Sequence, residues 1–303
     1  MGAALSLSKR AAAPPAAAAA APKAPVVAPE VSPEPAAVDE AAAAWSAGPP
    51  NAAVVEAGKC VLGDDWTALP LQARTWVASD TVVLSFALKA GQPLNLATCA
   101  CVLARIGEVV RPYTPVSTNG MMGRFELMVK VYGEGGVSHA LSKLPLGEKV
   151  DFKHIPQNVK RQYPFGAAKL SMLCGGSGVT PMLQALHAIL GTDTDVTEVS
   201  FLYASKTSTN ILAKDALDAW ACPRLKVKHV LSQEPADSPW TGARGRIDAQ
   251  FIRDHFQPPQ EGALIFVCGP AQFYDAFCGP RGETEITGVL GELGYTKDMV
   301  VKF

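Results

Sequence analysis

The stretch KLSMLCGGSGVTPMLQALHAIL, residues 169–190, decides how the second half of this chain folds. Residues 169–174 form a short apolar run typical of a strand, and residues 181–190 form a helical run that opens on a proline. Glycines between a strand and a helix let the backbone approach a ligand closely, and the free amides at the helix start favour an anion such as pyrophosphate. The spacing differs from the G-x-G-x-x-G fingerprint, and a purely structural turn is the alternative for these glycines taken alone.

The chain around this stretch alternates between strand-like and helix-like segments from about residue 164 to the end. Further strands are predicted at residues 199–205, 224–232 and 263–269, and further helices at residues 213–221, 247–256 and 288–295. Strand and helix in alternation predict a parallel sheet with helices on both faces. The second domain, residues 164–303, is therefore expected to be α/β and doubly wound.

Before residue 164 the sequence pattern predicts strands without intervening helices. Short alternating strands are predicted at residues 81–88, 97–106, 124–132 and 147–155, with Gly, Pro and Asn between them. Regularly spaced short strands with turn signals favour an antiparallel β-barrel or sandwich. We expect an antiparallel β-barrel domain over residues 59–163, followed by the α/β domain.

The first 58 residues are rich in Ala and Pro and are expected to form a disordered tail. At its start, Gly2 and Ser6 fit the M-G-x-x-x-[ST] pattern for N-myristoylation, with Lys9 and Arg10 close behind. A myristoyl chain would bring the protein to a membrane surface. The alternative is an unmodified or organelle-targeting leader, since starts rich in Ala, Ser and Arg also resemble transit peptides.

Charge and cysteine content exclude several classes of protein. With 27 basic and 28 acidic residues the formal net charge is −1, which gives no electrostatic case for nucleic acid binding. The seven cysteines include no CxxC pair, so neither a disulfide framework nor a metal site is indicated. Outside the tail no apolar run is long enough to span a membrane.

Three other motifs carry residues suited to cofactor binding. In RPYTP, residues 111–115, Arg111 can bind a phosphate through two hydrogen bonds, Tyr113 can lie against a flat ring, and Thr114 can donate a hydroxyl. GGVSH, residues 135–139, opens a short helix in which Ser138 taken alone would be an N-cap. FVCGP, residues 266–270, ends a strand at the sheet edge where doubly wound folds bind ligands, although its cysteine could be a buried apolar residue.

Taken together, these segments resemble the NADH–cytochrome b5 reductase family within the wider ferredoxin–NADP reductase-like flavoproteins. The matching pieces occur in the family's order and cover residues 60–303. They are RPYTPVS, ELMVKVY, GGVSHAL, LCGGSGVTPMLQALHAIL, FLYASKTSTNILAKDAL, FVCGP and LGYTKDMVVKF. The start MGAALS is also similar to the myristoylated start of family members.

The resemblance implies two cofactors, FAD and NADH, and a set of residues for each. Thr114, Thr180 and Cys268 would lie nearest to the hydride transfer, as the catalytic residues. The FAD site would be formed by Arg111, Pro112, Tyr113, Thr114, Met128, Lys130, Tyr132, Val137, Ser138, His139 and Phe303. The NADH side would be formed by Gly175, Gly176, Ser177, Gly178, Thr180, Cys268, Gly269 and Pro270.

The sequence departs from the family pattern at three places, of which the first is a short loop before GGVS. HIPQNVKRQYPF stands where a Gly-Pro pair usually follows the last barrel strand. Leu231-Ser232-Gln233 stands where members often carry an Asp that accepts a hydrogen bond from the ribose 2′-hydroxyl. NADH is the expected donor, but the missing acid leaves NADPH open.

Three functions compete at this point. The first is a reductase for a membrane haem protein of the cytochrome b5 type, in which flavin takes up hydride and releases single electrons. The second is a flavin reductase for a ferric chelate, a quinone or another acceptor, and the third is a non-catalytic, membrane-tethered interaction protein. The first implies a monomer on the cytoplasmic face of the endoplasmic reticulum or mitochondrial outer membrane, the alternative being a soluble cytosolic or organellar protein.

Cytochrome b5-type proteins carry acidic groups around the exposed haem edge, so a reductase for them needs local positive charge. A solvated charged rim is the alternative reading of any such cluster. The candidate basic residues near the junction of the two domains are Lys149, Lys153, Lys160 and Arg161.

Overall fold

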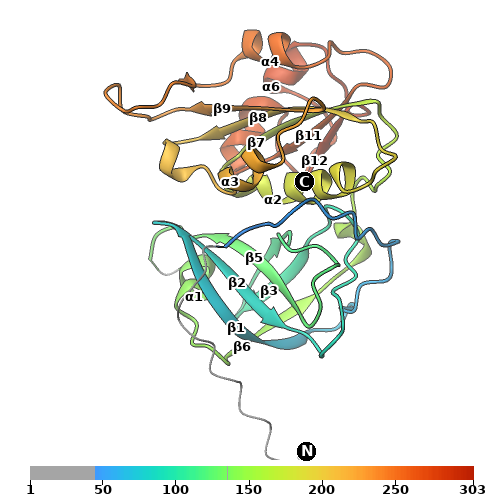
Figure 1. Cartoon of the computed structure of the whole chain (residues 1–303), viewed down its shortest axis with the longest axis vertical. Helices are drawn as coiled ribbons and strands as arrows, with labels where there is room; N and C mark the ends of the chain where they lie inside the picture. Colours follow the sequence, from blue (N-terminus) through green and yellow to red (C-terminus); the bar gives the residue numbers. More distant parts are fainter. Residues whose placement is uncertain (1–44, 135) are drawn as a thin grey trace, which may run out of the picture. The chain divides into compact units, whose positions relative to one another are not determined.

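The computed structural model describes residues 45–134 and 136–303, so Gly2 and its myristoylation pattern lie outside the described residues. Within this part the barrel domain has an antiparallel sheet in the order β4-β3-β6-β1-β2-β5 (Figure 1). The strands are β1 (Thr67–Ala78), β2 (Thr81–Ala87), β3 (Val102–Ile106), β4 (Val109–Tyr113), β5 (Arg124–Lys130) and β6 (Lys149–Lys153). Helix α1 (Val137–Lys143) lies between β5 and β6. The expected antiparallel domain is confirmed.

Strand β1 bends the barrel sheet over its core. Its first residues, Thr67–Pro70, pair with β6, and its later residues pair with β2 after a register shift near Leu71. The enclosed core centres on Phe86, Phe125 and Phe152, whose ring centroids lie 4.7–5.8 Å apart. Such aromatic contacts add to the burial of apolar area, so they stabilise the scaffold that carries β4 and β5.

The second domain has a parallel sheet in the order β10-β9-β8-β7-β11-β12, as expected for a doubly wound fold. Its strands are β7 (Lys169–Gly175), β8 (Glu198–Ser205), β9 (Leu225–Leu231), β10 (Ala243–Arg244), β11 (Leu264–Cys268) and β12 (Val300–Lys302). Its helices are α2 (Val179–Leu190), α3 (Lys214–Ala219), α4 (Ala249–His255), α5 (Ala271–Phe277) and α6 (Gly288–Glu292).

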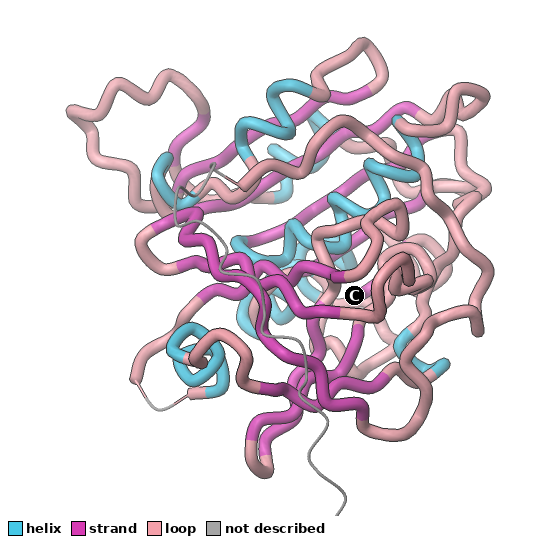
Figure 2. The backbone as a smooth tube through the Cα atoms, turned by 60° about the horizontal axis from the view of Figure 1, so that its bottom comes forward, coloured by secondary structure: helices cyan, strands magenta, loops and turns pink. Residues whose placement is uncertain are grey.

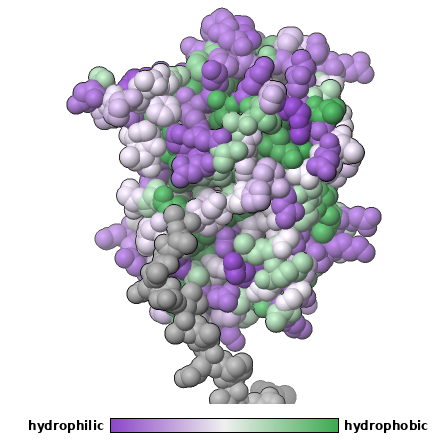
Figure 3. Space-filling view, in the orientation of Figure 1, coloured by the Kyte–Doolittle hydropathy of each residue, from purple (hydrophilic) through white to green (hydrophobic). Residues whose placement is uncertain are grey.

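The two faces of this sheet have separate cores because side chains alternate along each strand. Met172 and Phe201 face the core shared with α2 and α3, whereas Leu173 and Leu202 face the core shared with α4, α5 and α6. Figure 2 shows helices on both sides of these strands. On the face drawn in Figure 3, polar and apolar side chains are interspersed.

The strand order reverses at β7, and this reversal positions the site. From β7 the chain runs outward through β8 and β9, then returns to place β11 on the other side of β7. Ligands of such sheets bind at the carboxyl ends of the two strands that flank the reversal. Here those ends are Cys174–Gly175 on β7 and Cys268 on β11, which are register partners at Cys174.

The structure differs from the sequence-based expectations in two respects. Residues 45–58 were assigned to the tail, yet residues 45–53 hydrogen-bond to both domains. Strands β1 and β4 and helix α5 were not predicted: β1 mixes exposed and half-buried positions without alternation, and β4 is a largely exposed edge strand. Among the described residues no helix combines the length and apolar character that a bilayer crossing requires.

Candidate active site

A cavity of about 420 Å³ is lined by residues from both domains, within one compact unit of the chain. This size is in the range typical of small-molecule sites. The barrel contributes Cys101, Arg111, Pro112, Tyr113, Thr114, Met128, Lys130, Tyr132, Gly136, Val137 and Ser138. The α/β domain contributes Ser177, Gly178, Thr180, Pro181, Cys268, Gly269, Pro270, Tyr274, Arg281 and Phe303.

The end of β4 delivers an arginine and a tyrosine to the barrel side of this cavity. Arg111 is exposed, and its Nη1 donates to the carbonyl of Val110 at 2.9 Å, which leaves the other guanidinium donors available to a ligand. Burial raises the pKa of Tyr113 to about 12, against the opposing effect of Arg111. Tyr113 therefore stays neutral at physiological pH and presents a half-buried ring.

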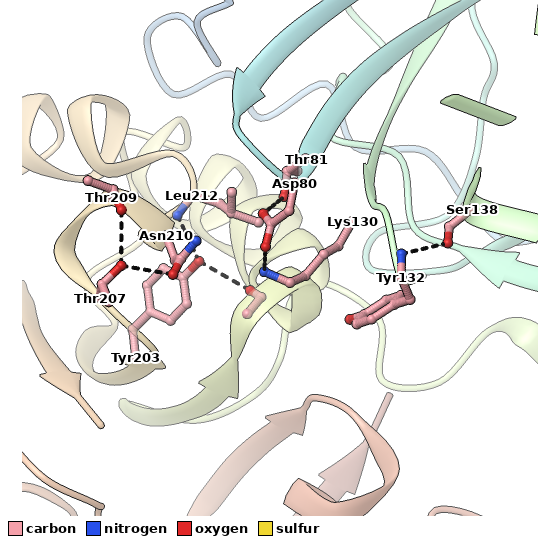
Figure 4. A network of polar contacts seen from close by, with 11 residues as sticks. Asp80, Thr81, Lys130, Tyr132, Ser138, Tyr203, Thr207, Thr209, Asn210 and Leu212 are labelled. Carbon is pink, nitrogen blue, oxygen red and sulfur yellow. Dashed lines mark hydrogen bonds and ion pairs between the residues drawn. The ribbon is translucent and has the colours of Figure 1, made fainter. Parts of the chain in front are cut away.

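Lys130 lines the cavity with its ammonium already paired. Its Nζ lies 2.6 Å from Asp80 Oδ2, and Thr81 Oγ1 donates to Asp80 Oδ1 at 2.9 Å (Figure 4). Burial opposes ionisation of Asp80, but these two hydrogen bonds and the charge of Lys130 leave the pKa of this carboxyl lowered. The ion pair fixes the Lys130 stem against the cavity instead of leaving a free charge there.

Ser138 connects the start of α1 to the end of β5. Its Oγ accepts a hydrogen bond from the backbone N–H of Tyr132 at 3.0 Å (Figure 4), and the N-cap position of α1 is Gly136. The N-cap alternative for Ser138 is therefore wrong. Its hydroxyl proton is free to point into the cavity, which Ser138 lines together with Val137.

The glycine turn after β7 is fixed by a buried tyrosine. Gly176 has a φ of +55°, a conformation that side chains rarely adopt, and its carbonyl accepts from Tyr203 Oη at 3.1 Å. The same Tyr203 oxygen accepts from the backbone N–H of Leu212 at 3.1 Å (Figure 4). Tyr203 of β8 thus fixes the turn that leads into α2.

Gly178 allows the two halves of the α/β site to touch. A Cβ added at this position would lie 2.2 Å from the carbonyl oxygen of Cys268 and 2.9 Å from the nitrogen of Gly269. Only a glycine permits such a close approach of two backbones. This contact places Thr180, at the start of α2, beside the end of β11.

Cys268 and the chain terminus complete the cavity wall. Burial raises the pKa of the Cys268 thiol, so this group stays protonated at neutral pH. Phe303 is buried, with its ring 5.0 Å from Phe266 and its main-chain oxygen accepting from Tyr274 Oη. These contacts fix an apolar wall opposite the barrel residues.

Most of the residues predicted from sequence line this one cavity, but His139, Gly175 and Gly176 do not. Gly175 and Gly176 shape the turn behind the cavity wall, and the His139 carbonyl accepts from Ser142 Oγ within α1. Sequence reasoning missed five lining residues, Cys101, Gly136, Pro181, Tyr274 and Arg281. Cys101 could have been found from strand pairing, because Val102 is the register partner of Tyr113. Tyr274 lies on an unpredicted helix, and no local signal marks Arg281.

Comparison with known proteins agrees with this division into two cofactor-binding domains. The family model of an oxidoreductase FAD-binding domain matches residues 68–157, and that of an oxidoreductase NAD-binding domain matches residues 172–279. The NADH-cytochrome b5 reductase 2 of Meyerozyma guilliermondii is 34% identical over 252 residues, which cover 80% of this chain and 85% of that protein. The chain belongs to the NADH-cytochrome b5 reductase family. It is a flavoprotein NADH oxidoreductase with FAD and NAD-binding domains.

Other members of the family show similar identity. NADH-cytochrome b5 reductase 2 of Saccharomyces cerevisiae is 33% identical, over 82% of this chain and 86% of its own. The Arabidopsis thaliana NADH-cytochrome b5 reductase-like protein is 32% identical, over 79% of this chain and 77% of its own. The family is thus matched across both domains.

Solved structures share the fold. The cytochrome b5 reductase domain of Ulva prolifera nitrate reductase has a TM-score of 0.68 and 25% identity, over 79% of this chain and 97% of that chain. The CS-b5R domains of human Ncb5or have a TM-score of 0.66 and 24% identity, over 79% of this chain and 69% of that chain. The second likeness concerns the fold alone.

Proposed function

We propose that this reductase takes hydride from NADH onto FAD and delivers single electrons to a cytochrome b5-type haem protein. The observation that carries the proposal is that a single cavity joins the barrel residues around Arg111 to the sheet edge around Gly178 and Cys268. Bound FAD would supply the change from a two-electron donor to a one-electron acceptor. Because the cavity is complete within one chain, we infer that the enzyme works as a monomer.

The barrel side of the cavity fits FAD. Arg111 offers unpaired guanidinium donors to a pyrophosphate, and the hydroxyl of Ser138 offers one more. The half-buried ring of Tyr113 and the buried side chain of Met128 offer apolar surface to a flat ring system. We infer that Thr114, next in the chain, hydrogen-bonds to the same ring.

The α/β side of the cavity fits a nicotinamide. Gly178 and Thr180 end the turn at the strand-order reversal, and the neutral thiol of Cys268 faces them across the same edge. A protonated thiol neither attacks nor withdraws a proton at neutral pH. We infer that Cys268 acts by shape, holding the nicotinamide against the flavin and excluding water. Phe303 and Tyr274, which are hydrogen-bonded to each other, line the same cavity.

An anaerobic titration tests the proposed function directly. NADH added to the purified, FAD-loaded protein is expected to bleach the flavin absorbance, and soluble cytochrome b5 added afterwards is expected to become reduced. A flavin that stays oxidised in excess NADH would contradict the enzyme activity. A reduced flavin that passes electrons to a quinone or ferric chelate, but not to cytochrome b5, would favour the flavin reductase alternative.

Two cations near Cys101, a residue that lines the cavity, are suited to dock the haem protein. Arg281 lines the cavity, and both Arg281 and Lys160 lie close enough to Cys101 to lower its pKa against the larger effect of burial. Lys302 Nζ donates to the carbonyls of residues 279, 280, 283 and 285 at 3.0–3.3 Å, which fixes the loop that carries Arg281.

The other basic residues of the predicted cluster have different surroundings. Lys153 Nζ lies 4.7 Å from the centroid of the Trp66 ring, and Arg161 Nε donates to the carbonyl of Phe165 at 3.0 Å. Lys149 is exposed at the far end of β6. We therefore propose that Lys160 of the predicted cluster, together with Arg281 from outside it, meets the acidic groups around a haem edge.

Reversing the charge of Lys160 is expected to weaken the productive encounter with cytochrome b5. Lys160→Glu should raise the apparent KM for cytochrome b5 roughly threefold to tenfold at low salt, and the difference should vanish at high salt because exposed charges are screened. Steady-state assays across a salt series measure this effect. Lys149→Glu is the charge-matched control, and an equal effect from both variants would place the docking surface elsewhere.

We also propose that Gly2 is myristoylated and holds the enzyme on the cytoplasmic face of the endoplasmic reticulum or mitochondrial outer membrane. The support is the sequence pattern Met1-Gly2 with Ser6, followed by Lys9 and Arg10. One acyl chain with a few basic residues gives reversible binding to a bilayer surface.

Gly2→Ala removes the acceptor for myristate and leaves the described domains unchanged. The variant is expected to move from the membrane fraction to the soluble fraction while it keeps the wild-type rate of flavin reduction by NADH. Fractionation and labelling with a myristate analogue measure this, with Ser8→Ala, outside the pattern, as the control. Membrane association unchanged by Gly2→Ala would indicate a transit peptide or another anchor.

A further inference from the structure

Residues 45–53, which we call the strap, run across the surface of both domains. On the barrel side, Trp45 Nε1 donates to Glu126 Oε2 at 2.9 Å, and Asn119 Nδ2 donates to the carbonyl of Ala53 at 3.0 Å. Glu126 lies on β5, two and four residues before Met128 and Lys130 of the cavity. The strap therefore contacts the strand that carries the FAD side of the site.

On the α/β side the strap contacts the end of α2 and the residue after α3. Trp220 Nε1 donates to the carbonyl of Gly48 at 2.8 Å, and the backbone N–H of Asn51 donates to His187 Nδ1 at 3.1 Å. The rings of His187 and Trp220 lie 4.6 Å apart at a steep angle. A short segment of chain thus hydrogen-bonds to both domains at once.

The fit between the strap and the domains is close. A Cβ at Gly191 would lie 2.5 Å from the nitrogen of Ala52 and 2.9 Å from the carbonyl carbon of Asn51. His187 must be unprotonated at Nδ1 to accept from Asn51, and burial lowers the pKa of this imidazole to about 4. The acceptor is therefore present throughout the neutral range.

Helix α2 links the strap to the reacting centre. Its first turn carries Thr180 and Pro181 into the cavity, and its last turn carries His187 to the strap. Between them, Gln184 Nε2 donates to the barrel carbonyls of Pro115 and Ser117 at 2.7 and 2.8 Å. An α-helix transmits a displacement along its axis because its backbone hydrogen bonds hold it rigid. A displacement of the last turn of α2 would therefore also displace Thr180 in its first turn.

We propose that the strap is a positioning element for hydride transfer. It holds the last turn of α2 against β5, so that the first turn of α2 keeps the nicotinamide at a fixed distance from the flavin. Trp45, Asn51, His187 and Trp220 are the positioning residues. This inference rests on the proposed NADH-to-FAD transfer, and it assigns to residues 45–53 a role in the rate of that step instead of in cofactor binding.

The test separates the rate of hydride transfer from the binding of either cofactor. In the full-length, FAD-loaded protein, Trp45→Ala with Trp220→Phe removes one contact to each domain. Stopped-flow reduction by NADH then gives the rate constant and the Kd for NADH separately. We expect the rate constant to fall roughly tenfold to hundredfold, as for a misplacement of about 1 Å, with FAD content and the Kd for NADH unchanged. The charge-transfer absorbance of nicotinamide stacked on flavin should weaken as well.

A pair of milder variants keeps the test valid if the double variant does not fold. Glu126→Gln retains an acceptor for Trp45 Nε1 and is expected to keep the wild-type rate, whereas Glu126→Ala is expected to lower it. Trp76→Ala, at an exposed tryptophan of β1 that has no contact with the strap among the described hydrogen bonds, controls for loss of an indole. A wild-type rate in the folded double variant, or in Glu126→Ala if the double variant does not fold, overturns the proposal. Losses of FAD or of NADH affinity that match the loss of rate also overturn it, because they indicate a purely structural role.

Hydrogen exchange distinguishes failure of this inference from failure of the proposed function. In oxidised enzyme without NADH, the amides at the end of α2 are expected to exchange faster in the double variant than in the wild type. If the wild-type flavin were not reduced by NADH, the proposed function would fail while this comparison still tested the strap. Unchanged exchange at the end of α2 would show that the strap does not hold this helix.

Discussion

Gly178→Ala is expected to remove most of the NADH-dependent reduction of the flavin while leaving FAD bound. The added Cβ would lie 2.2 Å from the Cys268 oxygen and 2.5 Å from the Cys268 carbonyl carbon, and these are backbone atoms that cannot rotate away. The turn and the end of β11 must separate, at a cost of about 1–3 kcal/mol in the free energy of unfolding. Because Thr180 and Cys268 then move apart, we expect the rate constant of flavin reduction to fall by about two orders of magnitude.

Stopped-flow reduction and thermal unfolding measure the two effects of this substitution. Gly282→Ala is the matched control, since an added Cβ there meets no atom within 4 Å and its φ is not in the left-handed region. The control should reduce and unfold as the wild type does. A wild-type reduction rate in Gly178→Ala would show that the contact between the turn and β11 does not set the nicotinamide site.

Arg111→Ala is expected to produce a folded protein that loses its flavin. A charged hydrogen bond contributes about 1.5–3 kcal/mol, so the Kd for FAD should rise roughly 10-fold to 100-fold. The exposed Arg111 side chain adds little to the barrel core, and the fold should persist. Flavin content after gel filtration and fluorescence titration with FAD measure the change.

Arg124→Ala serves as the control for the loss of an arginine on the barrel. Its Nε lies 3.7 Å from Glu126 Oε1, a weak surface pair, and it does not line the cavity. This variant should keep its flavin. Full flavin occupancy in Arg111→Ala would contradict the assignment of Arg111 to the pyrophosphate.

The class of each domain was predictable from sequence because it depends on local periodicity. The run 169–174, the glycine turn and the helical run 181–190 occupy β7, the turn and α2 in the structure. The alternation that follows predicts a parallel sheet for the same reason. The motif residues of β4 and β11 were candidates because of their chemistry and their places at strand ends, whereas Met128, Lys130 and Tyr132 on and after β5 followed only from the resemblance to the reductase family.

Other features arise only when distant elements pack together. Strand β1 belongs to the sheet because both β2 and β6 pair with it, and its own residues show no clean alternation. The hydrogen bonds of residues 45–53 are likewise hidden, because an Ala/Pro-rich composition predicts a tail and says nothing of the acceptors on α2 and β5. The tertiary hydrogen bonds, and not the local composition, therefore determine where residues 45–53 lie.

The two domain classes, the glycine turn and most of the residues that line the cavity could be predicted from the sequence alone. Only the packing of distant elements brings Arg111, Arg281 and Cys268 to one cavity and connects that cavity through α2 to the strap. The physical reason is the range of the interactions. Backbone propensity and side-chain alternation act over a few residues, whereas a shared cavity depends on strand order, and strand order is set by how the hydrophobic faces of distant elements are buried together.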